Sequence, residues 1–168
     1  LKSQAATKLT PKSKILCLAE GEGRNAVYLA GLGHDVKGVD SSSVGLEKAQ
    51  SLAEVNKVSI HTEVADLANF DIGEEKWEAI VSIFCHLPPP LRERIHSRVV
   101  SGLKPGGILI LEAYTPKQLE YKTGGPPNAA MMTTLEGLKA ELEGLTFEIG
   151  RELERDVVEG KYHTGKAH

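Results

Sequence analysis

The segment ILCLAEGEGRNAVYLA, residues 15–30, decides the fold class of this chain. It opens with a short apolar run, Ile15–Ala19, of the kind that forms a buried strand. Gly21 and Gly23 follow directly, and apolar residues then recur on one face of a predicted helix, Asn25–Leu32. Glycine lets the backbone turn sharply and come close to another molecule, so this strand, turn and helix predict a ligand site at the turn.

Four more predicted strands follow this segment, and helices separate most of them. The strands are expected at His34–Asp40, Val58–Val64, Trp77–Cys85 and Ile108–Glu112, with helices from Ser41–Ser43 to about Lys57 and from Arg92 to Leu103. This alternation favours a mostly parallel sheet with right-handed crossovers. Since a β/α barrel needs about 250 residues, we predict an α/β fold in which a doubly wound, Rossmann-like sheet forms a three-layer αβα sandwich.

The last third of the chain departs from this alternation. Residues 115–134 include several glycines and prolines, and a segment of this length is typical of a functional loop or lid. A helix is predicted at Leu135–Leu142 and an antiparallel edge strand at Thr146–Arg155. The final residues predict a turn whose returning strand would lie beyond His168, and the chain begins with Leu1 instead of Met. We therefore expect a single domain, residues 1–168, that is truncated at both ends.

Composition and charge restrict the class of partner. Hydrophobic residues make up 40% of the chain and charged residues 26%, which is typical of a globular protein. The formal net charge of -3 provides no positive field to attract phosphates, so we expect neither nucleic acid nor a membrane as partner. Cys17 and Cys85 lie in apolar runs and are expected to be reduced thiols. No apolar run approaches the roughly 20 residues of a membrane span. We predict a cytoplasmic protein that acts on a small molecule.

The residues that follow the first two predicted strands indicate the kind of ligand. Asp40 ends the second strand, 19 residues after Gly21, where this fold brings a carboxylate to the hydroxyls of a ribose. A nucleoside cofactor is therefore expected. A dinucleotide would place its pyrophosphate against the turn, but here the turn carries Glu20 and Glu22, which would repel it. These carboxylates suit the sulfonium and ammonium groups of S-adenosylmethionine, so the charges favour this cofactor.

These residues resemble the class I S-adenosylmethionine-dependent methyltransferases, and more narrowly the small branch similar to tellurite-resistance (TehB-like) methyltransferases. The resemblance covers nearly the whole chain and includes the turn LKPGG, Leu103–Gly107. It implies that the glycine-rich turn wraps the methionine part of the cofactor, that Asp40 holds the ribose, and that Asp66 meets the adenine amine with Leu67 beside the ring. The fourth strand would end near the sulfonium. The residues expected to bind the cofactor are Glu20, Gly21, Glu22, Gly23, Arg24, Asn25, Asp40, Ser41, Asp66, Leu67, Ser82, Ile83 and Phe84.

Two features depart from the pattern of this family. Cys17 and Ala19 stand where the family usually has an acid and a glycine, and Glu20 or Glu22 is the candidate to supply the missing carboxylate. The family also closes its sheet with a reversed hairpin of two strands, of which only the first is expected before His168.

Methyl transfer is an in-line displacement at a carbon that positive sulfur already activates, so the enzyme mainly aligns the acceptor and excludes water. A thiolate acceptor needs no base, whereas a hydroxyl acceptor needs one with a pKa near the operating pH. His86 is the candidate base, because it follows the fourth predicted strand at the edge where open α/β sheets bind ligands; its alternative role is to cap the strand end. The residues expected to contact the acceptor are Glu112, Tyr114, Tyr121, Thr123 and His163.

Two other functions stay open from the sequence. An NAD(P)-dependent oxidoreductase could use the same fold, since GEGRNA at residues 21–26 fits the looser dinucleotide fingerprint. A non-catalytic module that binds S-adenosylmethionine is the second, motivated by Cys17 and Ala19. The histidines and cysteines do not match the spacing of a zinc site, and no metal is expected. The charged run Arg92–Arg94 is predicted to be a solvated helix face.

Overall fold

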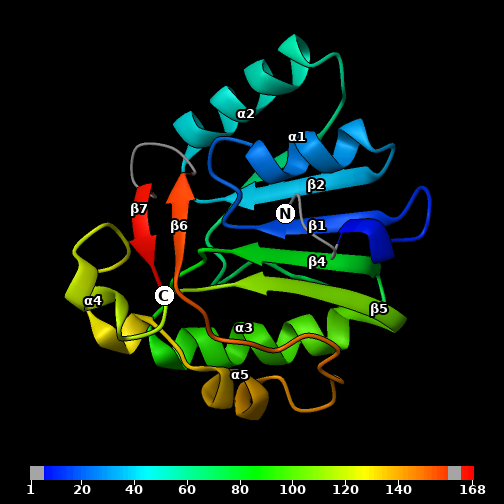
Figure 1. Ribbon diagram of the computed structural model, residues 1–168. Helices are drawn as coiled ribbons and strands as arrows, with labels where there is room; N and C mark the ends of the chain where they lie inside the picture. Colours follow the sequence, from blue (N-terminus) through cyan, green and yellow to red (C-terminus); the bar gives the residue numbers. More distant parts are fainter. Residues whose placement is uncertain (1–5, 159–163) are drawn as a thin grey trace. The chain divides into compact units, whose positions relative to one another are not determined.

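The computed structural model describes residues 6–158 and 164–168 (Figure 1). Two compact units make up the chain. The first unit consists of Leu1–Ile83 and Ser101–Leu111, and the second of Phe84–Val100 and Glu112–His168. None of the helices within the described ranges has the length and apolar character that crossing a membrane requires.

A five-stranded sheet with the strand order β3-β2-β1-β4-β5 forms the centre of the first unit. Its strands are β1 (Lys14–Leu18), β2 (Asp35–Asp40), β3 (His61–Val64), β4 (Trp77–Ile83) and β5 (Leu103–Glu112). β1 pairs in parallel with β2 on one side and β4 on the other, and β2 pairs in parallel with β3. The chain therefore reverses its direction of winding at β1, which confirms the prediction of a doubly wound, mostly parallel sheet.

Two helices of the first unit pack against this sheet and against each other. They are α1 (Arg24–Gly31) and α2 (Ser43–Val55), and a short 3-10 helix, η1 (Ala6–Lys8), precedes β1. The side chain of Ser42 accepts a hydrogen bond from the Gly45 amide at 3.0 Å, which confirms the predicted cap of the second helix. The core contains Ile15, Cys17, Ala26, Val27, Leu29, Val36, Ala49, Ala53, Ile60, Ala79, Val81 and Ile110.

Three strand boundaries differ from the sequence-based prediction by two residues or more. β3 begins at His61 instead of Val58, because the Val58 amide still donates to the Ala53 carbonyl at the end of α2, at 3.0 Å. β4 ends at Ile83 instead of Cys85, because Phe84 adopts a left-handed φ of 54° that cannot continue a strand. β5 begins at Leu103, so that it includes the predicted LKPGG turn.

The second unit contains helices and a separate antiparallel pair of strands. The elements are α3 (Pro89–Gly102, whose last two residues belong to the first unit), α4 (Gln118–Tyr121), the 3-10 helix η2 (Ala129–Met131), α5 (Leu135–Glu141), β6 (Arg155–Val158) and β7 (Thr164–Ala167). β6 and β7 form a two-stranded sheet of their own.

Two predictions about the C-terminal strands are therefore wrong. Thr146–Arg155 is not an edge strand, since regular pairing begins only at Arg155. Glu152 in this segment instead accepts the Leu135 amide at the first turn of α5, at 2.6 Å, so its carboxylate caps a helix. The returning strand expected beyond His168 is β7, which pairs with β6 within the chain.

Residues 115–134 are anchored at several points. The buried Gln118 side chain accepts the His168 amide at 3.0 Å and donates to Thr123 Oγ1 at 3.0 Å. Gly125, with φ +85°, lies so close to Tyr114 that an added Cβ would come within 2.7 Å of its ring. The segment expected as a lid is therefore tied to its own unit by side-chain hydrogen bonds and close packing.

Arg92 is not on a solvated face as predicted. Its guanidinium contacts both carboxylate oxygens of Glu141 on α5, with Nη2 to Oε1 at 2.7 Å, and both side chains are 11% exposed. Nη1 also donates to the carbonyl of Ala130 at 3.0 Å, which ties η2 to the start of α3. His96 Nδ1 lies 2.7 Å from the second oxygen of Glu141. This buried charge cluster joins three elements of the second unit.

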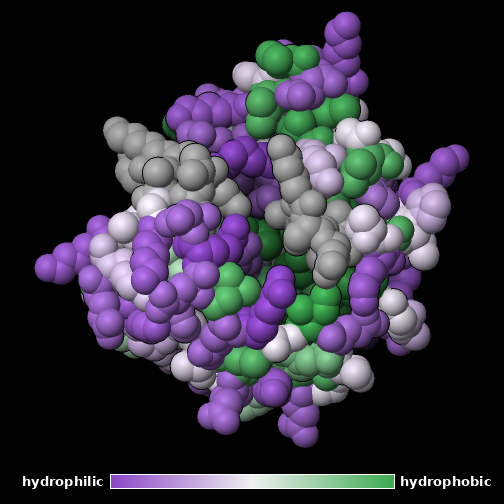
Figure 2. All heavy atoms as spheres, viewed as in Figure 1, coloured by the Kyte–Doolittle hydropathy of each residue, from purple (hydrophilic) through white to green (hydrophobic). Residues whose placement is uncertain are grey.

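The face shown in Figure 2 is mostly hydrophilic, and apolar side chains gather at the top over α2. Val44 and Val55 of this helix are 60% and 79% exposed.

Replacing Arg92 with Met should lower the free energy of unfolding by about 3 kcal/mol, because the change leaves a buried carboxylate without its bidentate partner. Chemical denaturation measures this loss. Lys139→Met, on the exposed side of α5, is the control and should stay within about 0.5 kcal/mol. Equal stabilities of the two variants would show that the Arg92 cluster contributes nothing.

Candidate functional site

The strands of the first unit end in register, and this brings the predicted cofactor residues to one edge of the sheet. Leu18 of β1 lies opposite Val39 of β2 and Ser82 of β4, while Asp40 lies opposite Val64 of β3. The pairing continues past the strands, because the Glu20 amide donates to the Val39 carbonyl at 3.1 Å. The turn after each strand is therefore at the carboxyl edge, where open α/β sheets bind ligands.

The glycines of the turn have different roles. Gly21 has φ +62°, and a Cβ added there would meet nothing within 4 Å, so its backbone faces open space. Gly23 has φ +86°, and an added Cβ would lie 2.6 Å from Cβ of Ala49, so this glycine allows the turn to pack against α2. Ala19 has φ 49°, a left-handed conformation that favours glycine. Gly21 is thus the position that a ligand can approach.

Asp40 links the end of β2 to this turn. Its Oδ2 accepts the Gly21 amide at 2.9 Å, and its Oδ1 accepts the Ser42 amide at 2.8 Å. Each carboxylate oxygen can accept a second hydrogen bond, so both retain capacity for the hydroxyls of a ligand. Ser41, the next predicted cofactor residue, is exposed beside it.

The two acids of the turn are in opposite environments. Glu20 is 7% exposed, and its Oε1 accepts the amides of Asn25 at 2.9 Å and Ala26 at 2.8 Å. Burial raises the pKa of Glu20 to about 7, although the two amides oppose this shift. Glu22 is exposed and pairs with Lys48 of α2 at 2.7 Å, and this partner lowers its pKa. Glu20 is therefore the acid that is buried beneath the turn.

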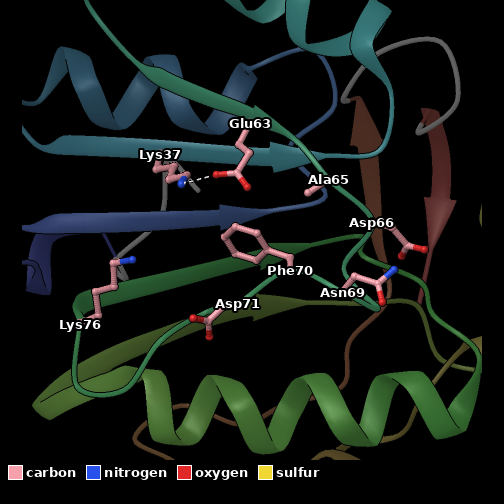
Figure 3. Close-up of a pocket in the computed structure, with 8 residues that line it drawn as sticks. All are labelled: Lys37, Glu63, Ala65, Asp66, Asn69, Phe70, Asp71 and Lys76. Atoms are coloured by element: carbon pink, nitrogen blue, oxygen red, sulfur yellow. Dashed lines mark ion pairs between the residues drawn. The ribbon is translucent and has the colours of Figure 1, made fainter.

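Asp66 follows β3 and begins a turn, in which its Oδ1 accepts the Ala68 amide at 2.8 Å. It lines a cavity of about 470 Å³, in which Lys37 and Glu63 form an ion pair at 2.6 Å and the Phe70 ring lies beside that pair (Figure 3). Leu67, beside Asp66 in the chain, is buried, as is Ser82 near the end of β4. The remaining residues of the predicted set differ in exposure: Arg24 is exposed, whereas Asn25 and Ile83 are half-buried.

In the second unit, three near-parallel rings come together after the ends of β4 and β5. The Tyr114 ring centroid lies 4.7 Å from that of Phe84 and 5.3 Å from that of His86, with interplanar angles of 25° and 7°. Tyr114 is 2% exposed, whereas Phe84 and His86 are half-buried. The Phe84 amide donates to the Glu112 carbonyl at 2.8 Å and helps to hold the left-handed backbone of Phe84. The candidate base His86, the predicted acceptor residue Tyr114 and the predicted cofactor residue Phe84 thus form one aromatic cluster.

The other predicted acceptor residues make contacts of their own. Glu112 forms an ion pair with Arg155 of β6. The Tyr121 hydroxyl donates to Glu154 at 2.6 Å, and Glu154 also pairs with Lys117 and Lys166. Thr123 donates to the Lys166 carbonyl, which ties it to β7. His163 lies outside the described residues. Within the described ranges, no group of three or more His, Cys, Asp or Glu residues could hold a metal ion.

The family of methyltransferase domains matches residues 15–107, which include the turn, Asp40, Asp66 and the first four strands of the sheet. The chain belongs to this family.

Two characterised relatives show the range of acceptors that similar chains use. A tRNA (uracil(54)-C(5))-methyltransferase of Pyrococcus abyssi is 30% identical over 125 residues, which are 69% of this chain and 29% of that protein. A 2-heptyl-1-hydroxyquinolin-4(1H)-one methyltransferase of Mycobacteroides abscessus is 28% identical over 109 residues, 63% of this chain and 48% of that protein. This methyltransferase domain therefore matches less than half of the length of either relative.

Solved structures share the fold of this methyltransferase domain. A SAM-dependent methyltransferase of Methanosarcina mazei has a TM-score of 0.77 at 20% identity and covers 99% of this chain and 94% of its own. TehB of Haemophilus influenzae has a TM-score of 0.76 at 22% identity, covering 96% of this chain and 56% of its own. The predicted resemblance to class I S-adenosylmethionine-dependent methyltransferases, with TehB among the structural neighbours, is confirmed. The matches favour this class over an NAD(P)-dependent oxidoreductase.

The residues of the methyltransferase domain fit S-adenosylmethionine as cofactor. Gly21 leaves open space beside the turn, Asp40 offers hydrogen-bond acceptors, and Glu20 adds a buried carboxylate where a cationic ligand would benefit from it.

Sequence reasoning missed several residues that organise the second unit. Gln118, Glu154 and Arg155 connect β6, β7 and α4, yet none has a neighbour in the sequence that signals this role. The pair Arg92 and His96 had a detectable signal, because residues four apart lie on the same side of a helix and can share a carboxylate.

The buried Glu20 should make stability depend on pH. Its folded pKa of about 7 is above the ordinary value of 4.5, so the unfolded chain loses this proton first as the pH rises. The stability that protonated Glu20 contributes is fully present below about pH 4.5. As the pH rises to 7, the free energy of unfolding should fall by about 3 kcal/mol on account of this residue. The measurement is the difference in unfolding free energy between the parent and Glu20→Gln across this window. Glu47→Gln, on the exposed side of α2, is the control. Profiles of parent and Glu20→Gln that run parallel would contradict the shift.

Proposed function

We propose that this methyltransferase domain transfers the methyl group of S-adenosylmethionine to a small-molecule nucleophile. The observation that carries the proposal is the cluster of Phe84, His86 and Tyr114 in the second unit. It combines apolar ring surface with an imidazole, which suits an acceptor that must be held by stacking and deprotonated.

For the cofactor, we propose contacts from the carboxyl edge of the first unit. Asp40 would accept the ribose hydroxyls, and the turn around Gly21 would hold the methionine part. Asp66 would accept the adenine amine, with Leu67 beside the ring. When bound, S-adenosylmethionine would supply a methyl group activated by its positive sulfur, and the sulfur would keep the electron pair of the broken carbon–sulfur bond as a neutral thioether.

A small acceptor is favoured over tRNA by the charge of the chain. The formal net charge of -3 gives no general attraction for a polyanion. The relative that acts on tRNA matches this chain over only 29% of its length, so most of that protein has no counterpart in the match. The relative that acts on a hydroxyquinolone shows that a similar domain can serve a small aromatic molecule.

His86 is the residue we propose as general base for a hydroxyl acceptor. Its imidazole would accept the proton of the acceptor hydroxyl and would later release that proton to solvent. A thiolate acceptor carries no such proton, so His86 would then only help to position it.

We also propose that the protein is cytoplasmic. Both cysteines, the buried Cys17 and the half-buried Cys85, are thiols and not a disulfide.

Asp40→Asn tests the cofactor site. The amide removes the charge and can turn an N–H toward the Gly21 or Ser42 amide, so the affinity for S-adenosylhomocysteine should fall by about 1–3 kcal/mol. Titration calorimetry measures this change. Asp35→Asn, at the opposite end of β2, is the matched control and should leave the affinity unchanged. An unchanged affinity in Asp40→Asn would remove its role in binding the ribose.

Transfer itself is tested with labelled S-adenosylmethionine and a panel of small phenols, hydroxyquinolones, thiols and metalloid oxyanions. With a hydroxyl acceptor, His86→Asn should lower the single-turnover rate by about 10²–10⁴, and the parent rate should rise through the pKa of the base. Cofactor affinity should stay the same. Equal rates and pH profiles would exclude His86 as the base. Transfer to unmodified tRNA but to none of the small acceptors would overturn the proposal.

A further inference from the structure

Glu20 occupies a space that the neighbouring strand leaves open for it. A Cβ added at Gly38 of β2 would lie 3.1 Å from Cγ and 3.3 Å from Cβ of Glu20. The absence of a side chain at Gly38 therefore allows the Glu20 carboxylate to lie under the turn, beside the buried Cys17 thiol of β1. From there it reaches the amides of the second and third residues of α1.

These hydrogen bonds fix the path of the turn. The first amides of a helix have no partner within the helix, so the carboxylate that accepts two of them sets where α1 begins. Glu20 also anchors the other end of the turn, because its own amide donates to the Val39 carbonyl of β2. Gly21, the residue open to a ligand, lies between these two anchors.

The positive groups around Glu20 do not fully neutralise the negative charge of its carboxylate. From β1 it faces the Cys17 thiol, and from α1 the exposed Arg24, whose positive charge lowers the Glu20 pKa less than burial raises it. From β2, the carboxylate of Asp40 adds a second negative charge at the Gly21 amide. From α2, Lys48 is engaged by Glu22 on the exposed side of the turn.

We propose that Glu20 is a positioning residue for the cofactor, which holds the turn through the α1 amides and supplies a buried negative charge that favours S-adenosylmethionine over S-adenosylhomocysteine. The inference rests on the cofactor site of the proposed function and adds to it a means of telling donor from product. The donor carries a sulfonium, whereas the product is a neutral thioether. A carboxylate in a poorly solvated position distinguishes these two charges more strongly than one exposed to water.

Proton linkage follows from this arrangement. At pH 7 about half of the Glu20 carboxyls are protonated, since burial raises the pKa to about 7. A cation bound nearby favours the ionised form, so donor binding should release up to about half a proton to solvent at this pH. The neutral product should release much less.

The experiment is titration calorimetry of the parent chain with S-adenosylmethionine and with S-adenosylhomocysteine at pH 6, 7 and 8. Using two buffers of different ionisation enthalpy gives the number of protons released. If the bound donor lowers the Glu20 pKa by about one unit, the affinity for the donor relative to the product should rise about fivefold from pH 6 to pH 8. The amino group that both ligands share titrates alike in each and largely cancels in this ratio.

Glu20→Gln keeps an oxygen that can accept the Asn25 and Ala26 amides but removes the charge. It should bind the product about as well as the parent does and lose the pH-dependent preference for the donor. Glu47→Gln removes an exposed carboxylate from α2 and should retain the parent behaviour. If Glu20→Gln does not fold, the proton count and the pH dependence of the parent alone decide the matter.

A donor-to-product ratio that is independent of pH in the parent, or that is unchanged in Glu20→Gln, would overturn the inference. Neither result would affect the proposed transfer to a small acceptor. Conversely, if the ratio behaves as expected but no small acceptor is methylated, the proposed function fails while the role of Glu20 stands.

Discussion

Parallel pairing of β1 between β2 and β4 is the constraint on which the cofactor edge depends. Because the three strands run the same way and end in register, the turns that follow them must share one edge of the sheet. The chemistry at this edge is then set by a few residues: an open backbone at Gly21, a carboxylate at Asp40 and a buried carboxylate at Glu20. Asp40 would not lie beside Glu20 and Gly21 in a chain whose strands paired differently.

The second unit is organised by charge and ring contacts instead of a continuous sheet. The cluster of Arg92, His96 and Glu141 fixes α3 to α5, while Glu154 connects α4 to the strand pair through Lys117 and Lys166. Such contacts rely on groups distant in the sequence, with little hydrophobic periodicity to support them. The aromatic cluster around Tyr114 is positioned by this framework, since Gly125 leaves space for its ring.

The parallel sheet and its edge were predictable because local signals and long-range pairing agree there. An apolar run, glycines with special backbone angles and a spaced acid at Asp40 each indicate the same arrangement. The C-terminal strands were mispredicted because residues 146–154 alternate like a strand while their carboxylates serve other partners, such as the α5 amide that Glu152 caps. Likewise, both acids of the turn were expected to serve the cofactor. Glu22 also pairs with Lys48 of α2, and the spacing of these two residues in the sequence does not reveal that contact.

Gly38 and Glu20 are 18 residues apart in the sequence but in direct contact in the fold, where the lack of a side chain at Gly38 leaves space for the glutamate. A methyl group at position 38 would push the Glu20 side chain away by a few tenths of an ångström. A shift of that size is enough to weaken the hydrogen bonds that Glu20 accepts from the α1 amides. Evolutionary change at these two positions should therefore be coupled. A lineage that replaced Glu20 with a smaller residue could admit a side chain on the middle of β2, whereas a lineage that retains the glutamate should retain the glycine.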